Sequence, residues 1–276
     1  FNKELEQKVT EKTARIENLL KQKDEFINQL SHDLKNPLGP LVNLLPIVEK
    51  HTTQEKDKKM LQVAQRNVNY MKNLVQKTLE LARLNSPNTT LTKKEVNLKK
   101  HIQGSIEQNK YLFKEKDVSV IVQIPDEIIV HADVLRLDEL FHNLLNNAVK
   151  YNKKHGHIII NAFDKEDTVT ISIEDDGIGM TSEQINHIFD EFYKADESRH
   201  DFESSGLGMA ICKQIVKKHN GTIWAESDGL KKGSTFFVTL PKHSVSNRKP
   251  INQNSKNQSR YHTITQEVDD LIEKRF

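Results

Sequence analysis

The sequence predicts two folds in one chain: an α-helical hairpin that forms a dimeric four-helix bundle, followed by an α+β two-layer sandwich. Up to residue 85, apolar residues recur at steps of three and four, which is the period of a helix. Beyond residue 90, short segments with alternating or continuous apolar residues are mixed with helical ones, which predicts strands and helices in one domain. The stretch NSPNTT, residues 85–90, has the composition of a linker between them.

Composition excludes several classes of protein. The chain has 276 residues, of which 36% are hydrophobic, so it has room for two domains with cores. With 41 basic and 39 acidic residues, it lacks the basic excess of a nucleic-acid-binding surface. The single cysteine, Cys212, excludes an internal disulfide and suits a reducing compartment. We therefore expect a cytoplasmic chain with no signal peptide and no membrane contact of its own.

The first 85 residues are predicted to be helical almost throughout. Residues 1–21 have the spacing of a coiled-coil signalling helix from an upstream sensor that is missing from this chain, which begins at Phe1. A solvated helix with a few apolar residues is the simpler alternative for this segment. The apolar stripe continues to Val48, Thr52 and Thr53 form a turn, and a second helix covers residues 54–85. Two helices with one apolar stripe each cannot bury both stripes as an isolated pair, so residues 22–88 are predicted to form a homodimer.

The second domain is predicted to span residues 89–242. Strands are expected at 118–124, 127–132, 157–163 and 168–175, and a final hairpin at 222–227 and 234–240. Helices are expected at 133–151 and 206–219, on one face of a mixed or antiparallel sheet. Residues 243–276 are polar, and we expect them to be disordered apart from a short helix at the end.

Three polar sites in this domain suggest a nucleotide pocket. In the predicted helix, Asn143 and Asn147 lie on one face, where their carbonyl oxygens suit a hard cation such as Mg²⁺ together with phosphate oxygens. In EDDGIGM, Asp175 is followed by Gly177 and Gly179, which allow the backbone to approach a flat ligand. Taken alone, an asparagine pair like the first motif is also common as polar residues on a helix face without a ligand. A sequence like the second is also common as a turn at the end of a strand.

The third site is the start of the helix at residues 206–219. Gly206 and Gly208 open this helix in the motif SSGLGMAI, and the free N–H groups of a helix start suit phosphates. A glycine-rich helix start is also common without any ligand. The order and spacing of the three sites argue against coincidence and point to one pocket.

This arrangement closely resembles the ATP-binding domain of the sensor histidine kinases, a Bergerat-type fold shared with gyrase, Hsp90 and MutL. The motifs NLLNNAVKY, DDGIGM, IFDEFYKAD, SGLGMAI and GSTF match its N, G1, F, G2 and G3 boxes. The resemblance implies that ATP is bound, with Asp175 recognising the adenine amino group and Asn147, assisted by Asn143, holding Mg²⁺. It further assigns nucleotide contacts to Lys150, Tyr151, Gly177, Gly179, Gly206, Leu207, Gly208 and Thr235.

The same resemblance places an ATP lid at residues 193–205, hinged near Phe189 and Phe192. The family usually has glycine two residues before Gly206, where this chain has Ser204. A serine is less free to adopt positive φ, so we expect the lid to close differently without loss of binding.

A second motif, FINQLSHDLKNPLGPL at residues 26–41, resembles the phosphoacceptor box of these kinases, with His32 as the acceptor. An imidazole attacks phosphorus only when the attacking nitrogen has a free lone pair, and Asp33 is placed to hold the proton on the other nitrogen. His32 lies off the apolar stripe, and the following prolines predict a bend near residues 33–37. Pro40 and Pro46 are additional to the usual box.

Two amides indicate which reactions follow. In hydrolysing relatives a glutamate four residues before the Mg²⁺ asparagine activates water; here that position is Asn143, which is not a base, so transfer is favoured over hydrolysis. Asn36 matches the residue that positions water in kinases that also dephosphorylate their partner. The resemblance therefore implies a dimeric kinase that phosphorylates His32 and then an aspartate of a separate response-regulator receiver domain, and also acts as its phosphatase. A catalytically weak nucleotide-binding scaffold and a chaperone-type or DNA-repair ATPase are the alternatives.

Overall fold

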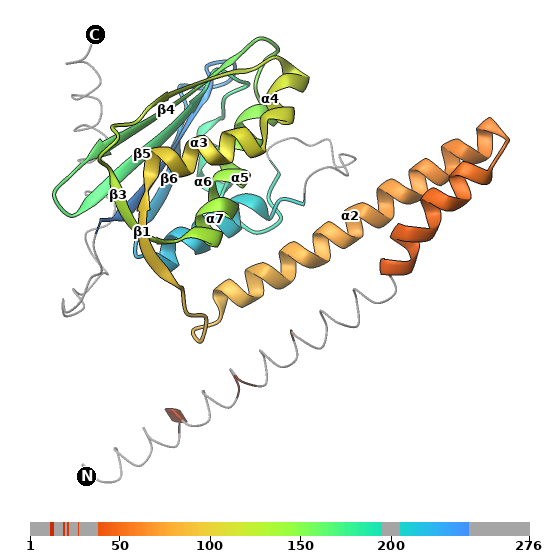
Figure 1. Ribbon diagram of the computed structural model, residues 1–276, viewed down its shortest axis with the longest axis horizontal. Coiled ribbons are helices and arrows are strands. Elements are labelled where there is room, and N and C mark those ends of the chain that lie inside the picture. Colours follow the sequence, from red (N-terminus) through yellow and green to blue (C-terminus); the bar gives the residue numbers. More distant parts are fainter. Residues whose placement is uncertain are drawn as a thin grey trace. The chain divides into compact units, whose positions relative to one another are not determined.

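The computed structural model describes residues 12, 13, 19, 21, 27, 38–194 and 205–242 (Figure 1). The predictions for the coiled coil, for the bend near residues 33–37 and for the tail at 243–276 fall mainly or wholly outside these residues. No helix in the described part of the chain is both long enough and apolar enough to cross a membrane.

The predicted hairpin is present. Residues 38–51 are helical, including Pro40 and Pro46, and a break at residues 52–54 leads into α2 (Glu55–Asn85). Thr52 stabilises the end of the first helix, because its hydroxyl donates to the carbonyl of Val48 at 2.8 Å. Near residues 86–89 the backbone turns, and α2 ends where the linker was expected.

The second domain is built on two sheets. The larger sheet has the strand order β2-β4-β5-β7-β6, formed by β2 (Ser119–Gln123), β4 (His157–Asp164), β5 (Thr168–Asp175), β6 (Thr222–Glu226) and β7 (Ser234–Pro241). Only β2 runs parallel to its neighbour, so the sheet is mixed. β1 (Lys93–Asn97) and β3 (Ile129–Asp133) form a separate antiparallel pair. The strands and helices predicted between residues 118 and 242 are all confirmed, with small differences at their ends.

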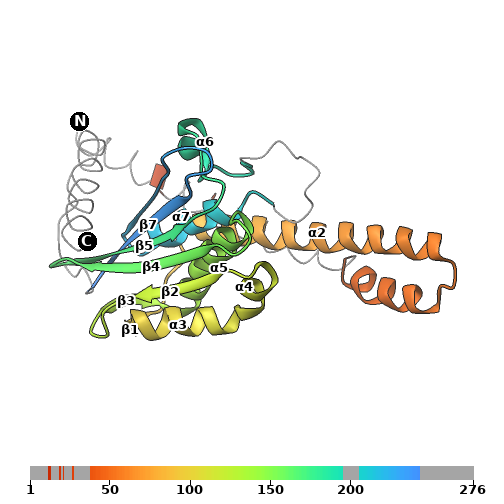
Figure 2. The ribbon, with the colours of Figure 1, turned by 90° about the horizontal axis from the view of Figure 1, so that it is seen from above.

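One helical layer covers one face of the larger sheet (Figure 2). It contains α3 (Leu98–Gln108), α5 (Val134–Lys150) and α7 (Gly208–Lys218); α4 (Lys110–Lys116) contacts α5, and α6 (Ser182–His187) follows β5 along the chain. The buried side of α5 carries Leu137, Leu140, Phe141, Leu144 and Leu145, all fully buried, so the amides of the same helix are left on another face.

A buried histidine joins two helices of this layer. The His219 ring donates from Nδ1 to the Ile215 carbonyl at 2.8 Å, and its Nε2 accepts the Asp133 backbone N–H at 3.0 Å. Asp133 is the N-cap of α5, so this neutral ring joins the end of α7 to the start of α5. Burial lowers the pKa of His219, which keeps the ring in the form that both bonds require. The two helices that carry the predicted site residues are thereby positioned relative to each other.

Candidate functional site

A cavity of about 380 Å³ lies among α5, the loop after β5, the start of α7 and β7. Eight of the residues predicted from sequence line it: Asn143, Asn147, Lys150, Tyr151, Asp175, Gly179, Gly206 and Gly208. They come from three segments that are far apart in the chain. The sheet and the helical layer therefore bring the three predicted polar sites together at one cavity.

Three other predicted nucleotide-contacting residues do not line the cavity. Thr235 lies between Ser234 and Phe236, which do line it; because side chains alternate along a strand, Thr235 faces the other side of the sheet. Leu207 is fully buried in the core. The backbone of Gly177 packs closely against Tyr151, which does line the cavity: a Cβ on Gly177 would lie 2.3 Å from the Tyr151 carbonyl oxygen.

Asp175 is the only carboxylate among the described residues that line the cavity. It ends β5 and is 5% exposed, and its Oδ1 accepts the backbone N–H of Gly177 at 3.0 Å. Burial raises its pKa to about 6, and the negative charge of Asp176 adds to the effect. A desolvated carboxylate that faces a cavity favours a ligand that donates a hydrogen bond to it, as an adenine amino group does.

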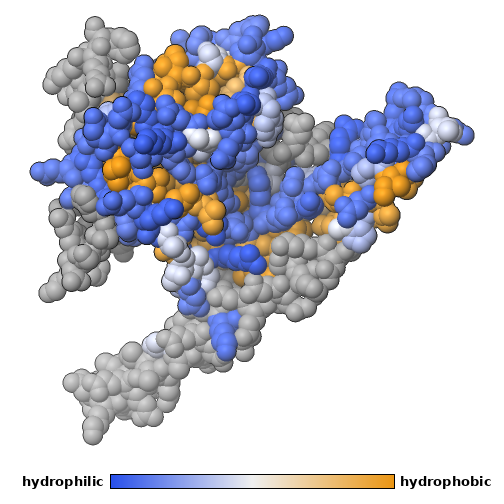
Figure 3. All heavy atoms as spheres, viewed as in Figure 1, coloured by the Kyte–Doolittle hydropathy of each residue, from blue (hydrophilic) through white to orange (hydrophobic). Residues whose placement is uncertain are grey.

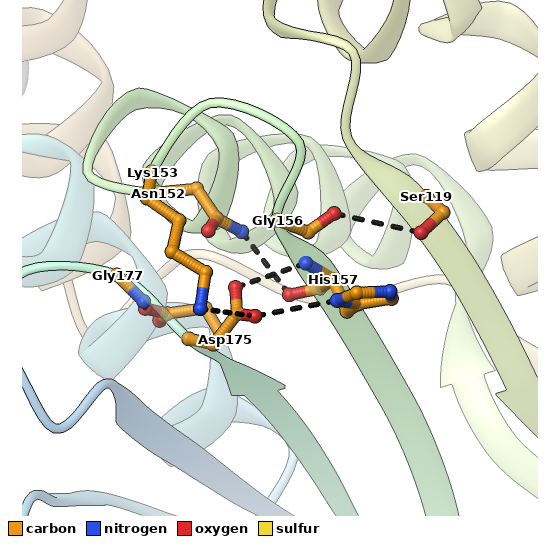
Figure 4. Close-up of polar contacts among 8 residues, drawn as sticks. Ser119, Asn152, Lys153, Gly156, His157, Asp175 and Gly177 are labelled. Carbon is orange, nitrogen blue, oxygen red and sulfur yellow. Dashed lines mark hydrogen bonds and ion pairs between the residues drawn. The ribbon is translucent and has the colours of Figure 1, made fainter.

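The neighbouring Asp176 does not line the cavity and connects the loop after β5 to the loop between α5 and β4. Its carboxylate accepts the His157 N–H at 2.9 Å and is ion-paired with Lys153 at 2.9 Å (Figure 4). Burial alone would raise the pKa of Asp176, but these hydrogen bonds outweigh it and leave the pKa below its usual value. Ile178 also donates to the Tyr151 carbonyl at 3.1 Å. The segment that carries Asp175 is thus tied to the end of α5, which carries Asn147.

The residues of α5 and α7 at the cavity have the features of an anion and metal site. Asn143 and Asn147 lie one turn apart on α5, and a Cβ on Gly208 would lie 3.3 Å from Asn143 Oδ1. The start of α7 therefore approaches the amides closely, with its backbone N–H groups at the cavity. Amide oxygens beside free N–H groups and Lys150 fit Mg²⁺ with phosphates, which would supply the remaining oxygen ligands.

The two residues that flank the predicted lid, Phe192 and Gly206, contact each other. Phe192 and Gly206 have φ angles of 63° and 70°, and a Cβ on Gly206 would lie 2.7 Å from the Phe192 carbonyl carbon. Residues 195–204, including Ser204, lie outside the described residues, so the lid and its hinge stay a prediction. His32, Asp33 and Asn36 also lie outside them.

Sequence reasoning missed several residues at the cavity. Ile178, Met180, Leu230 and Phe236 supply apolar walls to the cavity. Ile178 and Met180 stand in DDGIGM and Phe236 in GSTF, but none of them has a polar group that would have marked it as a ligand contact, and Leu230 lies outside the motifs. Lys77 was also missed, because it belongs to α2 in the hairpin, far from the cavity in sequence. Asn146 was also missed, although it stands in the run NLLNNAVKY that already indicated the site.

Two family comparisons match separate parts of the chain. Residues 22–87 match the family described as "His Kinase A (phospho-acceptor) domain", and residues 132–244 match "Histidine kinase-, DNA gyrase B-, and HSP90-like ATPase". Among curated proteins, the sensor histidine kinase YclK of Bacillus subtilis (strain 168) is 33% identical over 244 residues, which cover 85% of this chain and 50% of YclK. The chain thus spans about half the length of this relative.

Solved structures share the fold. Full-length ShkA in complex with AMPPNP has a TM-score of 0.67 at 21% identity and covers 81% of this chain and 47% of that chain. Histidine kinase ThkA, solved in complex with response regulator protein TrrA, has a TM-score of 0.57 at 23% identity, covering 79% of this chain and 61% of that chain. Both the helical hairpin and the sandwich therefore belong to an architecture seen in other proteins.

Proposed function

The chain belongs to the sensor histidine kinase family, and we propose that it binds Mg-ATP in this cavity, phosphorylates His32 and transfers the phosphoryl group to an aspartate of a separate response regulator. The observation that carries the proposal is the cavity itself, which brings together the buried Asp175, Asn147 and the N-terminus of α7. ThkA, whose fold the chain shares, is solved with a response regulator, which supports this class of partner.

Each part of the cavity has a role in this proposal. Asp175 accepts a hydrogen bond from adenine, and the N–H groups at the start of α7 together with Lys150 bind phosphates. Asn147 and Asn143 would hold Mg²⁺, which neutralises charge on the phosphates when bound. These groups position ATP and exclude water, and neither amide acts as a general base.

The chemical step belongs to His32. Its ring nitrogen attacks the γ-phosphorus while the bond to the bridging oxygen of ADP breaks, and the N–H proton on the other nitrogen is held by Asp33. Transfer to the regulator then breaks the N–P bond and forms an acyl phosphate on aspartate. Asn36 is proposed to position water for dephosphorylation of the regulator. A slower release of phosphate from a phosphorylated receiver domain with Asn36→Ala would support that role, and an unchanged rate would exclude it.

A homodimer is proposed for the hairpin. Its described part exposes large apolar side chains, which a single chain leaves in water (Figure 3): Leu41, Leu44, Ile47, Val48, Met60, Val63 and Met71. An apolar surface of this kind along two helices favours burial against a second copy. Light scattering of the chain is expected to give twice the monomer mass, and a monomer at micromolar concentration would contradict the proposal.

Incubation with γ-labelled ATP and Mg²⁺ tests the kinase activity. We expect label on the protein that is acid-labile and base-stable, because a phosphoramidate has this stability and a phosphoester does not. His32→Gln is expected to remove the label while leaving nucleotide binding unchanged, since the binding residues proposed above all belong to the second domain. His51→Gln is the matched control and should be labelled normally. Nucleotide binding without label in the unsubstituted chain would favour a scaffold, and steady ADP release without label would favour a hydrolase.

A further inference from the structure

One wall of the cavity is supplied by the hairpin. Lys77 of α2 lines the same cavity as Asn143, Lys150 and Gly208. The C-terminal half of α2 is fixed there, because it contacts α7 and because Leu81 and Leu84 are buried in the core of the second domain. An ion pair between Glu80 and Arg136 of α5 adds to this attachment. Lys77 is therefore held at the cavity by the packing of its own helix.

Lys77 lies toward the end of the cavity where α5 and α7 meet. The groups that act on its charge are Cys212 of α7 and Glu139 and Lys150 of α5. Cys212 is one turn beyond Gly208, and Glu139 is one turn before Asn143, and Asn143 and Gly208 approach each other closely at this point. Asn143 and Gly208 belong to the part of the cavity that is proposed to hold phosphate and metal.

The ammonium group of Lys77 has no adequate counter-charge there. Burial lowers its pKa, and the positive charge of Lys150 lowers it further. The carboxylate of Glu139 attracts the ammonium group of Lys77, but it is also ion-paired with Arg136 at 2.9 Å. Burial raises the pKa of the Cys212 thiol, so this group is neutral. Within the described residues, no hydrogen bond or ion pair is formed by the Lys77 side chain. A partly buried lysine that faces a cavity and forms no hydrogen bond or ion pair among the described residues favours an anionic ligand.

We propose that the ammonium group of Lys77 binds the polyphosphate of the nucleotide, so that the ligand joins the hairpin helix to the ATP-binding domain. This inference rests on the proposed function, because it requires a nucleotide in the cavity. Binding of a nucleoside triphosphate would then hold the C-terminal half of α2 against α7, whereas a nucleoside monophosphate would not reach Lys77. The nucleotide becomes a physical link between the two predicted domains.

Replacing Lys77 with methionine tests the proposal, because methionine keeps most of the apolar stem and removes the charge. We expect the full chain with Lys77→Met to bind ATP about tenfold more weakly, which is what the loss of one charge-assisted contact gives. AMP binding should be unchanged, and Lys77→Arg should retain most of the ATP affinity. Lys72→Met, on the same helix but away from the cavity, is the matched control and should bind as the unsubstituted chain does.

Two further measurements separate a ligand contact from a structural role. The melting temperature of Lys77→Met without nucleotide should be equal or higher, because a partly buried charge without a partner is removed. ATP should slow hydrogen exchange in residues 70–84 of the unsubstituted chain, and this effect should disappear in Lys77→Met. If the unsubstituted chain binds ATP and Lys77→Met binds it equally well, this inference is wrong and the proposed function stands. If the unsubstituted chain binds no nucleotide, both fail.

Discussion

Replacing Asp175 with asparagine is expected to weaken ATP binding by roughly 100-fold or more while making the free protein more stable. Binding is lost because a charged acceptor for adenine is replaced by a neutral one, and hydrogen bonds to buried charged groups are worth roughly twice those between neutral groups. Calorimetric titration with ATP measures the first effect. Asp176→Asn, one residue along and outside the cavity, is the control and should bind ATP far better than Asp175→Asn.

The gain in stability follows from the raised pKa. Asp175 titrates at about 6 in the folded chain instead of at 3.8, so ionisation of the folded protein is unfavourable. The Asp175 carboxyl group therefore stabilises the folded state fully below about pH 4. This stabilising contribution is lost as the pH rises through about 6. At pH 8, Asp175→Asn is expected to raise the free energy of unfolding by on the order of 1–3 kcal/mol. Denaturant unfolding at pH 5 and pH 8 tests this, and a variant less stable than the unsubstituted chain at pH 8 would contradict it.

The second large effect is expected from a methyl group at Gly177. The Cβ of Gly177→Ala would lie 2.3 Å from the Tyr151 carbonyl oxygen and 2.7 Å from Asp175 Oδ1, so the loop after β5 has to move away from the end of α5. We expect a loss of about 1–3 kcal/mol in the free energy of unfolding, as overpacking usually gives. ATP affinity should fall as well, because the same movement shifts Asp175.

Gly104→Ala is the matched control for this substitution. Gly104 lies inside α3, and a Cβ there would meet nothing within 4 Å. Alanine is the better helix former, so the free energy of unfolding should rise by roughly 0.5–1 kcal/mol. Denaturant unfolding of both variants is therefore expected to show opposite signs. Gly177→Ala with unchanged stability and unchanged ATP binding would show that the close approach to Tyr151 does not matter.

Periodicity predicted most of the architecture because the larger elements have clear patterns. The alternation in residues 157–163 and 168–175 predicted β4 and β5, which pair with each other in antiparallel orientation. β1, α3, α4 and α6 were not predicted. β1 is a five-residue strand with two lysines and a glutamate, and α3 contains Gly104, so neither shows a strong local preference. The N-cap Asn97, which accepts from the Lys100 N–H, was the signal available for α3.

The residues that line the cavity were also predicted only in part. Asn143, Asn147 and Asp175 could be found because each stands in a motif, and the motifs follow one another in an order and at a spacing typical of a nucleotide pocket. Thr235 does not line the cavity, because membership of a motif says nothing about which face of a strand a side chain occupies. The pairing of Asp175 with Ser234 determines that face, and it is a contact between distant segments. The position of Lys77 could not be predicted from the sequence either, because only tertiary packing brings α2 to the cavity.

The contact between the two ends of the predicted lid affects how this part of the chain can evolve. Since Phe192 and Gly206 already touch, the entropy of closing the loop between them rises only with the logarithm of its length. Insertions or deletions between these residues are therefore expected to leave the walls of the cavity in place. Isothermal titration of ADP against chains with two glycines added after Asp196 would measure this tolerance. The segment predicted to be the lid is thus expected to be exchangeable between relatives without a change in the cavity.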